Sequence, residues 1–161
     1  MALSDQEIRR REERKELAVL GINPYPSELF PVNTTAQDIL ENYLKQKNNI
    51  TIAGRLMSRR IMGSASFAEI QDSTGRIQIY IRRDDICPEE DKTLYNIGFK
   101  KLLDIGDIIG VHGFVFTTQT GEISIHVTSL KLLTKSLKPL PIVKSVEDDS
   151  GEKKVWDAFE D

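Results

Sequence analysis

The chain has little of several residue types on which whole classes of protein depend. Its 161 residues include one cysteine, Cys87, so neither an internal disulfide nor a cysteine-based zinc site can form. No apolar run approaches the roughly 20 residues that a membrane-spanning helix needs. The charged first residues also lack the apolar segment of a secretory signal. We therefore expect a cytoplasmic protein with no membrane partner, made of one ordinary domain with extensions.

The sequence also lacks the motifs of common catalytic and phosphate-binding sites. Neither a G-x-S-x-G nucleophile elbow nor a G-x-x-x-x-G-K-[ST] phosphate loop occurs. His112 and His126 have no cysteine partner and no second histidine at a spacing of four, so we interpret both as ordinary strand residues. We predict no catalytic, cofactor-binding or metal-binding residue in this chain.

Charge is distributed unevenly along the chain, although the formal net charge is only −3. Residues 145–161 carry seven acids against two lysines, whereas residues 51–83 carry six arginines against two acids. A basic middle segment of this kind attracts a polyanion. A charged face that contacts only water is the alternative explanation.

Two helices are predicted before residue 49. Ser4 and Glu7 have the spacing of a capping box, and Gly21 followed by Pro24 ends the pattern, which predicts a helix over 5–20. Because this helix has few apolar residues, we expect it to lie on the surface or to be loosely held. Four of its arginines are candidates for phosphate contacts: Arg9, Arg10, Arg11 and Arg14. The second, shorter helix opens at Thr35 and Asp38 and carries four apolar residues on one side: Ile39, Leu40, Tyr43 and Leu44.

From residue 49 the apolar residues alternate with polar ones, as in strands with one face in water. The pattern predicts, in order, three strands (50–57, 67–71 and 76–82), a helix (88–103) and two strands (108–116 and 122–133). This is the order of the OB-fold, a five-stranded Greek-key barrel. We therefore predict a mainly β protein with helices, divided into an N-terminal helical extension (1–48), an OB-fold domain (49–136) and an exit segment (137–161). The acidic end of the exit segment is interpreted as disordered or as a docking segment.

The predicted barrel places an aromatic side chain on a polar face. OB-folds bind ligands on the outer face of strands 2 and 3 and on the loops between strands 1–2 and 4–5, here 62–65 and 117–121. If Ala68 and Ile70 point inward, Phe67 points outward, where either another segment covers it or a ligand stacks on it. Gln78 and Tyr80 on strand 3, and Arg55 and Arg59 on strand 1, are predicted to share its face. Aromatic, amide and guanidinium groups together are what unstacked bases require, which favours a nucleic-acid ligand.

Four segments of the chain, in order, resemble the anticodon-binding domain of the bacterial-type lysyl-tRNA synthetase family. They are IAGRLMSRRIMGSASFAEIQD (52–72), GRIQIY (75–80), GEISIH (121–126) and LTKSLKPLP (133–141). The resemblance extends from the charged N-terminal helix to residues 156–159, where the catalytic domain of the family would begin. Aspartyl- and asparaginyl-type relatives share the barrel, but the segments 59–63 and 137–141 favour the lysyl family.

The resemblance implies a set of anticodon-binding residues. In the family, a base stacks on the phenylalanine matching Phe67, the glutamine matching Gln78 reads a base edge, and Arg59 and Glu122 complete the reading. Three neighbours have less defined roles: Arg60, Arg55 and Tyr80. A Glu122 carboxylate accepts from N3–H of uracil and repels the N3 acceptor of cytosine, so the set favours a U-rich lysine anticodon. A purely structural role after the turn at Gly121 is the alternative for Glu122.

The resemblance also implies the activity of a longer protein. The family attaches lysine to its tRNA for protein biosynthesis, using ATP and Mg²⁺ in a class II catalytic domain that also forms a homodimer. We expect residues 137–161 to lead toward such a domain, and we expect this chain itself to bind the anticodon loop of lysine tRNA without catalysis. Two alternatives stay open: a generic binder of single-stranded nucleic acid or oligosaccharide, and a protein-interaction module that docks a partner on Phe67.

Overall fold

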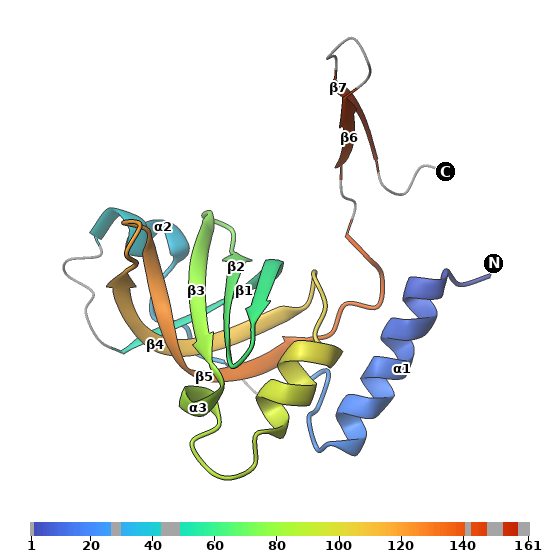
Figure 1. The fold of residues 1–161 in the computed structure, drawn as a ribbon, viewed down its shortest axis with the longest axis horizontal. Helices are drawn as coiled ribbons and strands as arrows, with labels where there is room; N and C mark the ends of the chain where they lie inside the picture. The colour runs from blue at the N-terminus through green and yellow to red at the C-terminus, as the bar shows by residue number, and fades with distance from the viewer. Residues whose placement is uncertain (1, 27–29, 43–48, 141–142, 148–152, 158–161) are drawn as a thin grey trace.

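Five strands form a closed barrel at the centre of the molecule (Figure 1). This computed structural model describes residues 2–26, 30–42, 49–140, 143–147 and 153–157. The strands are β1 (Ile50–Met62), β2 (Ala65–Gln71), β3 (Arg76–Arg82), β4 (Ile108–Thr117) and β5 (Ile123–Thr134). They pair in the order β1-β2-β3-β5-β4, with β4 closing onto β1 and with β3 and β5 parallel. The predicted OB-fold is confirmed.

The barrel core is built from every second residue of the strands. Ala68 and Ile70 are buried on β2, as the alternation predicts, and Ile77, Ile79 and Ile81 are buried on β3. β-Branched side chains suit the pleated inner surface, because their restricted rotamers pack well against neighbouring strands. The alternate residues of β2 and β3 therefore face outward, and they form the face that concerns the function.

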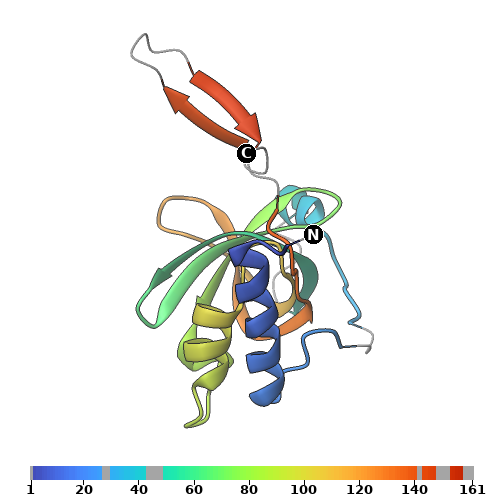
Figure 2. The ribbon, with the colours of Figure 1, turned by 90° about the vertical axis from the view of Figure 1, so that its right-hand side faces the viewer.

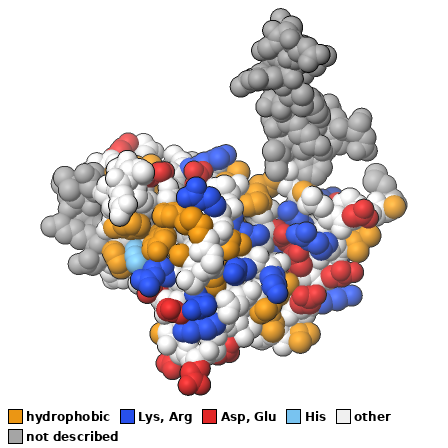
Figure 3. All heavy atoms as spheres, viewed as in Figure 1, with side chains coloured by type: hydrophobic (Ala, Val, Ile, Leu, Met, Phe, Trp, Pro, Cys, Tyr) orange, Lys and Arg blue, Asp and Glu red, His pale blue; other side chains and the backbone are white. Residues whose placement is uncertain are grey.

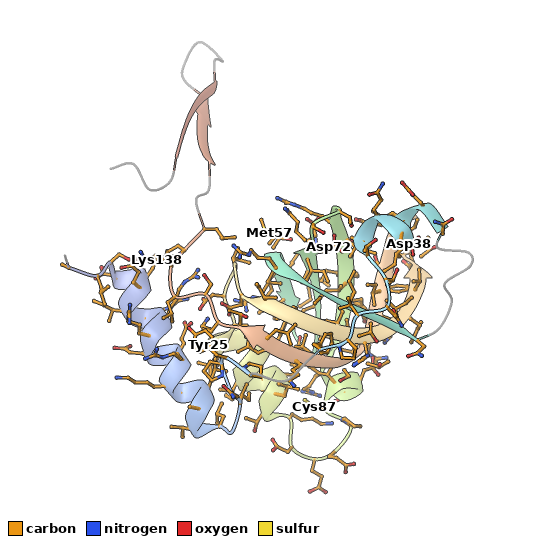
Figure 4. The ribbon with its side chains drawn as sticks, turned by 180° about the vertical axis from the view of Figure 1, so that it is seen from behind. Tyr25, Asp38, Met57, Asp72, Cys87 and Lys138 are labelled. Carbon is orange, nitrogen blue, oxygen red and sulfur yellow. The ribbon has the colours of Figure 1, made fainter. Side chains whose placement is uncertain are left out.

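A β-bulge interrupts the pairing of β1 with β2. Leu56 lies opposite Ile70, but the next pair is Ser58 with Glu69, so Met57 is an extra residue (Figure 4). Directly paired residues place their side chains on the same face of a sheet. The bulge therefore reverses the alternation of β1 in its second half.

The first helix, α1 (Asp5–Val19), confirms the prediction of a helix over 5–20. Its capping box is present: Glu7 N donates to Ser4 Oγ (3.2 Å), and Ser4 N donates to Glu7 Oε2 (3.1 Å). α1 packs beside the π-helix η1 (Leu94–Leu102), away from the outer face of β2 and β3 (Figures 1 and 2).

α1 is held to the barrel by buried charged side chains together with one fully buried apolar residue, Leu17. Arg10 is buried and donates to the carbonyls of Ile105 (3.1 Å), Ser136 (3.3 Å) and Lys138 (3.3 Å). The expectations of a loosely held helix and of a phosphate contact by Arg10 are therefore wrong, because one sequence does not reveal that a buried arginine has three carbonyl partners.

A cluster of mostly buried charges links α1, the residues just before β4 and the residue that follows β5. Lys135 Nζ lies 2.6 Å from Asp104 Oδ2, 2.8 Å from Asp107 Oδ2 and 3.3 Å from Glu13 Oε2. Arg9 adds contacts to Asp104 (3.0 Å) and Glu13 (2.9 Å). These five residues are called the charge cluster below.

The remaining helices cover the ends of the barrel. α2 (Ala36–Asn42) begins after Thr35, and its first amide, Ala36 N, donates to Asp72 Oδ2 (2.8 Å; Figure 4). Tyr43 and Leu44, predicted on this helix, lie outside the described residues. α3 (Arg83–Ile86) follows β3 directly. The packing residues predicted within 88–103 are buried as expected: Tyr95, Phe99, Leu102 and Leu103.

Two short strands follow the barrel. β6 (Val143–Glu147) and β7 (Lys153–Asp157) pair antiparallel and extend away from the barrel (Figures 1 and 2). The acidic end is interpreted above as disordered or as a docking segment; residues 143–147 and 153–157 pair as strands instead of being disordered, and the docking interpretation stays a prediction. Among the described helices, none combines the length and apolar character required to cross a membrane.

Candidate nucleic-acid interface

An open depression of about 940 Å³ lies on the outer face of the barrel, between the β1–β2 and β4–β5 loops. Six of the seven predicted site residues line it: Arg59, Arg60, Phe67, Gln78, Tyr80 and Glu122. The surface on the side of β2 and β3 gathers hydrophobic side chains and borders them with lysines and arginines (Figure 3). Arg55, the seventh, is exposed opposite Gln71 and does not line the depression.

Phe67 is half-buried and lies between a tyrosine and an arginine from neighbouring strands. Tyr80 is directly opposite on β3, with ring centroids 5.0 Å apart, and Arg60 is directly opposite on β1. The Arg60 guanidinium carbon lies 5.9 Å from the Phe67 ring centroid, within the range of a cation–π contact. α1 does not cover Phe67, because it packs on η1.

A polar pair lies beside this aromatic group. With its amide nitrogen oriented toward Glu122, Gln78 donates to Oε2 (2.7 Å) and Oε1 (3.1 Å) of the carboxylate. Glu122 is exposed, and its own amide donates to Thr118 Oγ1 (3.0 Å). The Gln78 carbonyl oxygen and the remaining lone pairs of the carboxylate stay free to meet a base edge. Glu122 thus both closes the β4–β5 loop and lines the depression.

Arg59 does not share the face of Phe67, which corrects the sequence prediction. Its Nη1 donates to the carbonyls of Phe99 (2.7 Å) and Leu103 (2.6 Å). Burial lowers the pKa of the Arg59 guanidinium from its ordinary value. The cause is the bulge at Met57, which reverses the alternation and gives the place beside Phe67 to Arg60. Arg59 still borders the depression, but one of its nitrogens already has two partners.

Sequence reasoning missed the aromatic contribution of β4. Phe116 lines the depression, and its ring centroid is 5.9 Å from that of Tyr80. Thr118 and Gln119, in the loop that follows, also line it. The available signal is the alternation of Phe114 and Phe116 within the predicted strand 108–116, which places two aromatic side chains on one face.

Comparison with known proteins identifies the family of the barrel. A tRNA-anticodon family profile, described as an OB-fold nucleic acid binding domain, matches residues 50–133. The chain belongs to this family. The match covers all five strands of the OB-fold domain except the last residue of β5.

Curated relatives of the OB-fold domain are lysine–tRNA ligases. The chain is 57% identical over 145 residues to that of Azobacteroides pseudotrichonymphae, covering 89% of this chain and 29% of the relative. It is 52% identical over 165 residues to that of Porphyromonas gingivalis, covering 100% and 28%. For Christiangramia forsetii the identity is 56% over 143 residues, covering 89% and 25%. The family resemblance read from four segments is confirmed, and the chain spans under a third of the length of these relatives.

Proposed function

We propose that this chain binds the anticodon loop of a lysine tRNA. The observation that carries the proposal is the Phe67 ring beside the Gln78–Glu122 pair within one open depression. A base stacked on Phe67 has its edge directed at polar groups, and base–aromatic stacking contributes about 1–3 kcal/mol per base. The identity with lysine–tRNA ligases supports the choice of tRNA.

Uracil fits the polar groups better than cytosine. Its N3–H donates to a carboxylate such as Glu122, whereas the bare N3 of cytosine is repelled by it. Arg60 is exposed beside the Phe67 ring, where it suits a phosphate of the same nucleotide. In this assignment Arg60, rather than Arg59, supplies the cation, and Arg55 and Tyr80 border the bound loop.

We further propose that the domain serves a longer protein that joins lysine to its tRNA in the cytoplasm. That protein would use ATP and Mg²⁺ and form a homodimer through a catalytic part that these residues do not include. The role of this chain is then to select the tRNA. The chain alone is expected to show no lysine-dependent ATP–pyrophosphate exchange, and measurable exchange would contradict this division of labour.

The direct test is equilibrium binding of two anticodon stem-loops that differ at one base. The first carries the UUU anticodon of lysine tRNA, and the second has its middle uracil replaced by cytosine. We expect the first to bind more tightly by about 1–3 kcal/mol, because the N3 lone pair of cytosine meets the Glu122 carboxylate at the place where uracil donates from N3–H. Equal affinity would reduce the domain to a generic binder of single-stranded nucleic acid.

Salt dependence separates RNA binding from protein docking. If Phe67 docks a protein partner, the stem-loop will show no saturable binding at low salt. RNA binding through arginines will weaken steeply as salt rises, because phosphate contacts release counterions. A titration of the same stem-loop at 50 and at about 200 mM salt measures the slope.

A further inference from the structure

A row of aromatic rings crosses the outer surface of the barrel beyond the depression. Phe67 lies opposite Tyr80, Tyr80 lies opposite His126, and His126 lies opposite Phe114. Successive ring centroids are 5.0, 5.3 and 4.7 Å apart. Since neighbouring strands are about 4.8 Å apart, the row runs about 14 Å from β2 to β4. Only its first two members line the depression.

The far end of the row is both exposed and firmly held. Phe114 is 38% exposed and stacks on His126 with an angle of 16° between the rings. His126 Nε2 lies 2.6 Å from Asp85 Oδ2 on α3, and Phe116 meets the imidazole edge-on at 5.8 Å. An exposed aromatic ring fixed in one orientation loses little conformational freedom when a second ring stacks on it.

An exposed arginine of β3, Arg82, lies next to the row of rings. Arg82 follows Tyr80 by two residues on β3, so it projects from the same outer face, and it is exposed. Its Nε lies 4.0 Å from Asp85 Oδ2 at the surface, a contact that leaves most of the guanidinium available. Arg60 and Arg82 thus place a positive charge at two points beside the row. An RNA that follows the row carries one negative phosphate per nucleotide, which such charges attract.

We propose that Phe114, held by His126, is a second stacking platform for another base of the same RNA loop. The proposal rests on the proposed function, because the RNA loop that stacks on Phe67 is also the one that extends across the barrel to Phe114. The RNA then stacks one base on Phe67 and a second, unpaired loop base on Phe114, with the intervening backbone near Arg82. His126 is a positioning residue in this arrangement.

The test pairs a protein variant with RNAs that lack one base. Phe114→Ala is titrated with the lysine anticodon stem-loop and with versions carrying a single abasic nucleotide at each loop position. Tyr25→Ala, which removes an exposed aromatic outside the row, is the matched control. We expect Phe114→Ala to weaken the intact loop about 5- to 30-fold and Tyr25→Ala to leave it unchanged. At the loop position whose base stacks on Phe114, the abasic RNA should bind the wild type as much more weakly as the intact loop binds Phe114→Ala. Phe114→Ala should bind this abasic RNA no more weakly than it binds the intact loop.

Two outcomes would overturn the second platform. One is an intact-loop affinity of Phe114→Ala equal to that of the wild type, and the other is a loss of affinity that persists at every abasic position. Phe114→Leu, which keeps apolar bulk but removes the π-face, replaces the alanine variant if the latter unfolds. Phe67→Ala separates the two proposals: if it weakens binding while Phe114→Ala does not, only the second platform fails. If neither does, the proposed function fails as well.

Discussion

Phe67 contributes a ring face to the surface rather than volume to the core, because its inward neighbours Ala68 and Ile70 fill the barrel. We expect Phe67→Ala to weaken binding of the anticodon stem-loop by about 1–3 kcal/mol. The free energy of unfolding should change far less than the roughly 3–5 kcal/mol lost when a core phenylalanine is truncated. Filter binding and urea unfolding of the same preparation measure both. Easy unfolding with unchanged RNA affinity would make Phe67 a core residue.

A substitution at Glu122 tests whether its carboxylate distinguishes the N3–H of uracil from the N3 acceptor of cytosine. Glu122→Gln keeps the shape of the side chain but removes the charge that repels cytosine N3. We expect weaker binding of the UUU stem-loop and a smaller difference between it and the cytosine version. Thr117→Ala, at an exposed position at the end of β4 and outside the depression, is the matched control and should preserve the difference. If Glu122→Gln also preserves it, Glu122 acts only in closing the loop.

The residues that the sequence placed well are those on regular strands. Phe67, Gln78 and Tyr80 follow from strict alternation on β2 and β3, where inward isoleucines define the outward positions. Arg59 was misplaced because a bulge has no reliable signal in one sequence. The contact between Gln78 and Glu122 joins β3 to the β4–β5 loop across α3, η1 and β4, and local patterns carry no information on such a pairing.

At the scale of elements, β4 depends on a glycine where it bends against β5. The register shifts between His112 and Gly113, and a Cβ at Gly113 would lie 1.9 Å from the carbonyl oxygen of His126. We expect Gly113→Ala to lower the free energy of unfolding by at least about 1–3 kcal/mol, because the clash is with backbone. Gly75→Ala is the matched control, since its Cβ meets open space. Urea unfolding compares the two, and equal stabilities would show that β4 relaxes at no cost.

Element types were more predictable than element limits. The alternation of isoleucines predicted β1, β2 and β3, but the helix predicted from residue 88 begins at Leu94 as η1. A turn precedes it, in which Thr93 N donates to Asp91 Oδ1 (2.9 Å). This turn chemistry is compatible with a helix start on either side of it, so spacing alone does not fix the first helical residue.

At the scale of the whole molecule, the charge cluster makes stability depend on pH. Burial raises the pKa of Glu13 from 4.5 to about 7, and its hydrogen bond with Asp104 adds to the shift. Burial alone would raise the pKa of Asp104, but hydrogen bonds from Glu13 and Lys135 outweigh it and lower the pKa to about 2. The folded state thus holds a proton on Glu13 that the unfolded chain releases above its ordinary pKa of 4.5.

Stability should therefore fall as the pH rises from about 4.5 to about 7, where the folded state binds more protons than the unfolded state. We expect a decrease of about 1–3 kcal/mol in the free energy of unfolding over this window. The Asp104 contribution is present above its ordinary 3.8 and is lost as pH falls toward about 2. Glu13→Gln should remove most of the decrease between pH 5 and 7.5, whereas the control Glu12→Gln, at an exposed position, should retain it. An identical pH profile for Glu13→Gln would contradict the raised pKa.

Because β4 closes the barrel, the start of β1 has no pairing partner in the nascent chain until β4 has been synthesised. β2 and β3 can pair with the end of β1 soon after they leave the ribosome, but Ile50 at its start pairs with Gly113, about 60 residues later. At the usual rate of about 5–20 residues per second, the start of β1 waits about 3–12 s for its partner. During that interval an apolar strand edge is open to pairing with another chain, which is the usual route to aggregation. Slower translation between β3 and β4 should therefore reduce the yield of folded domain.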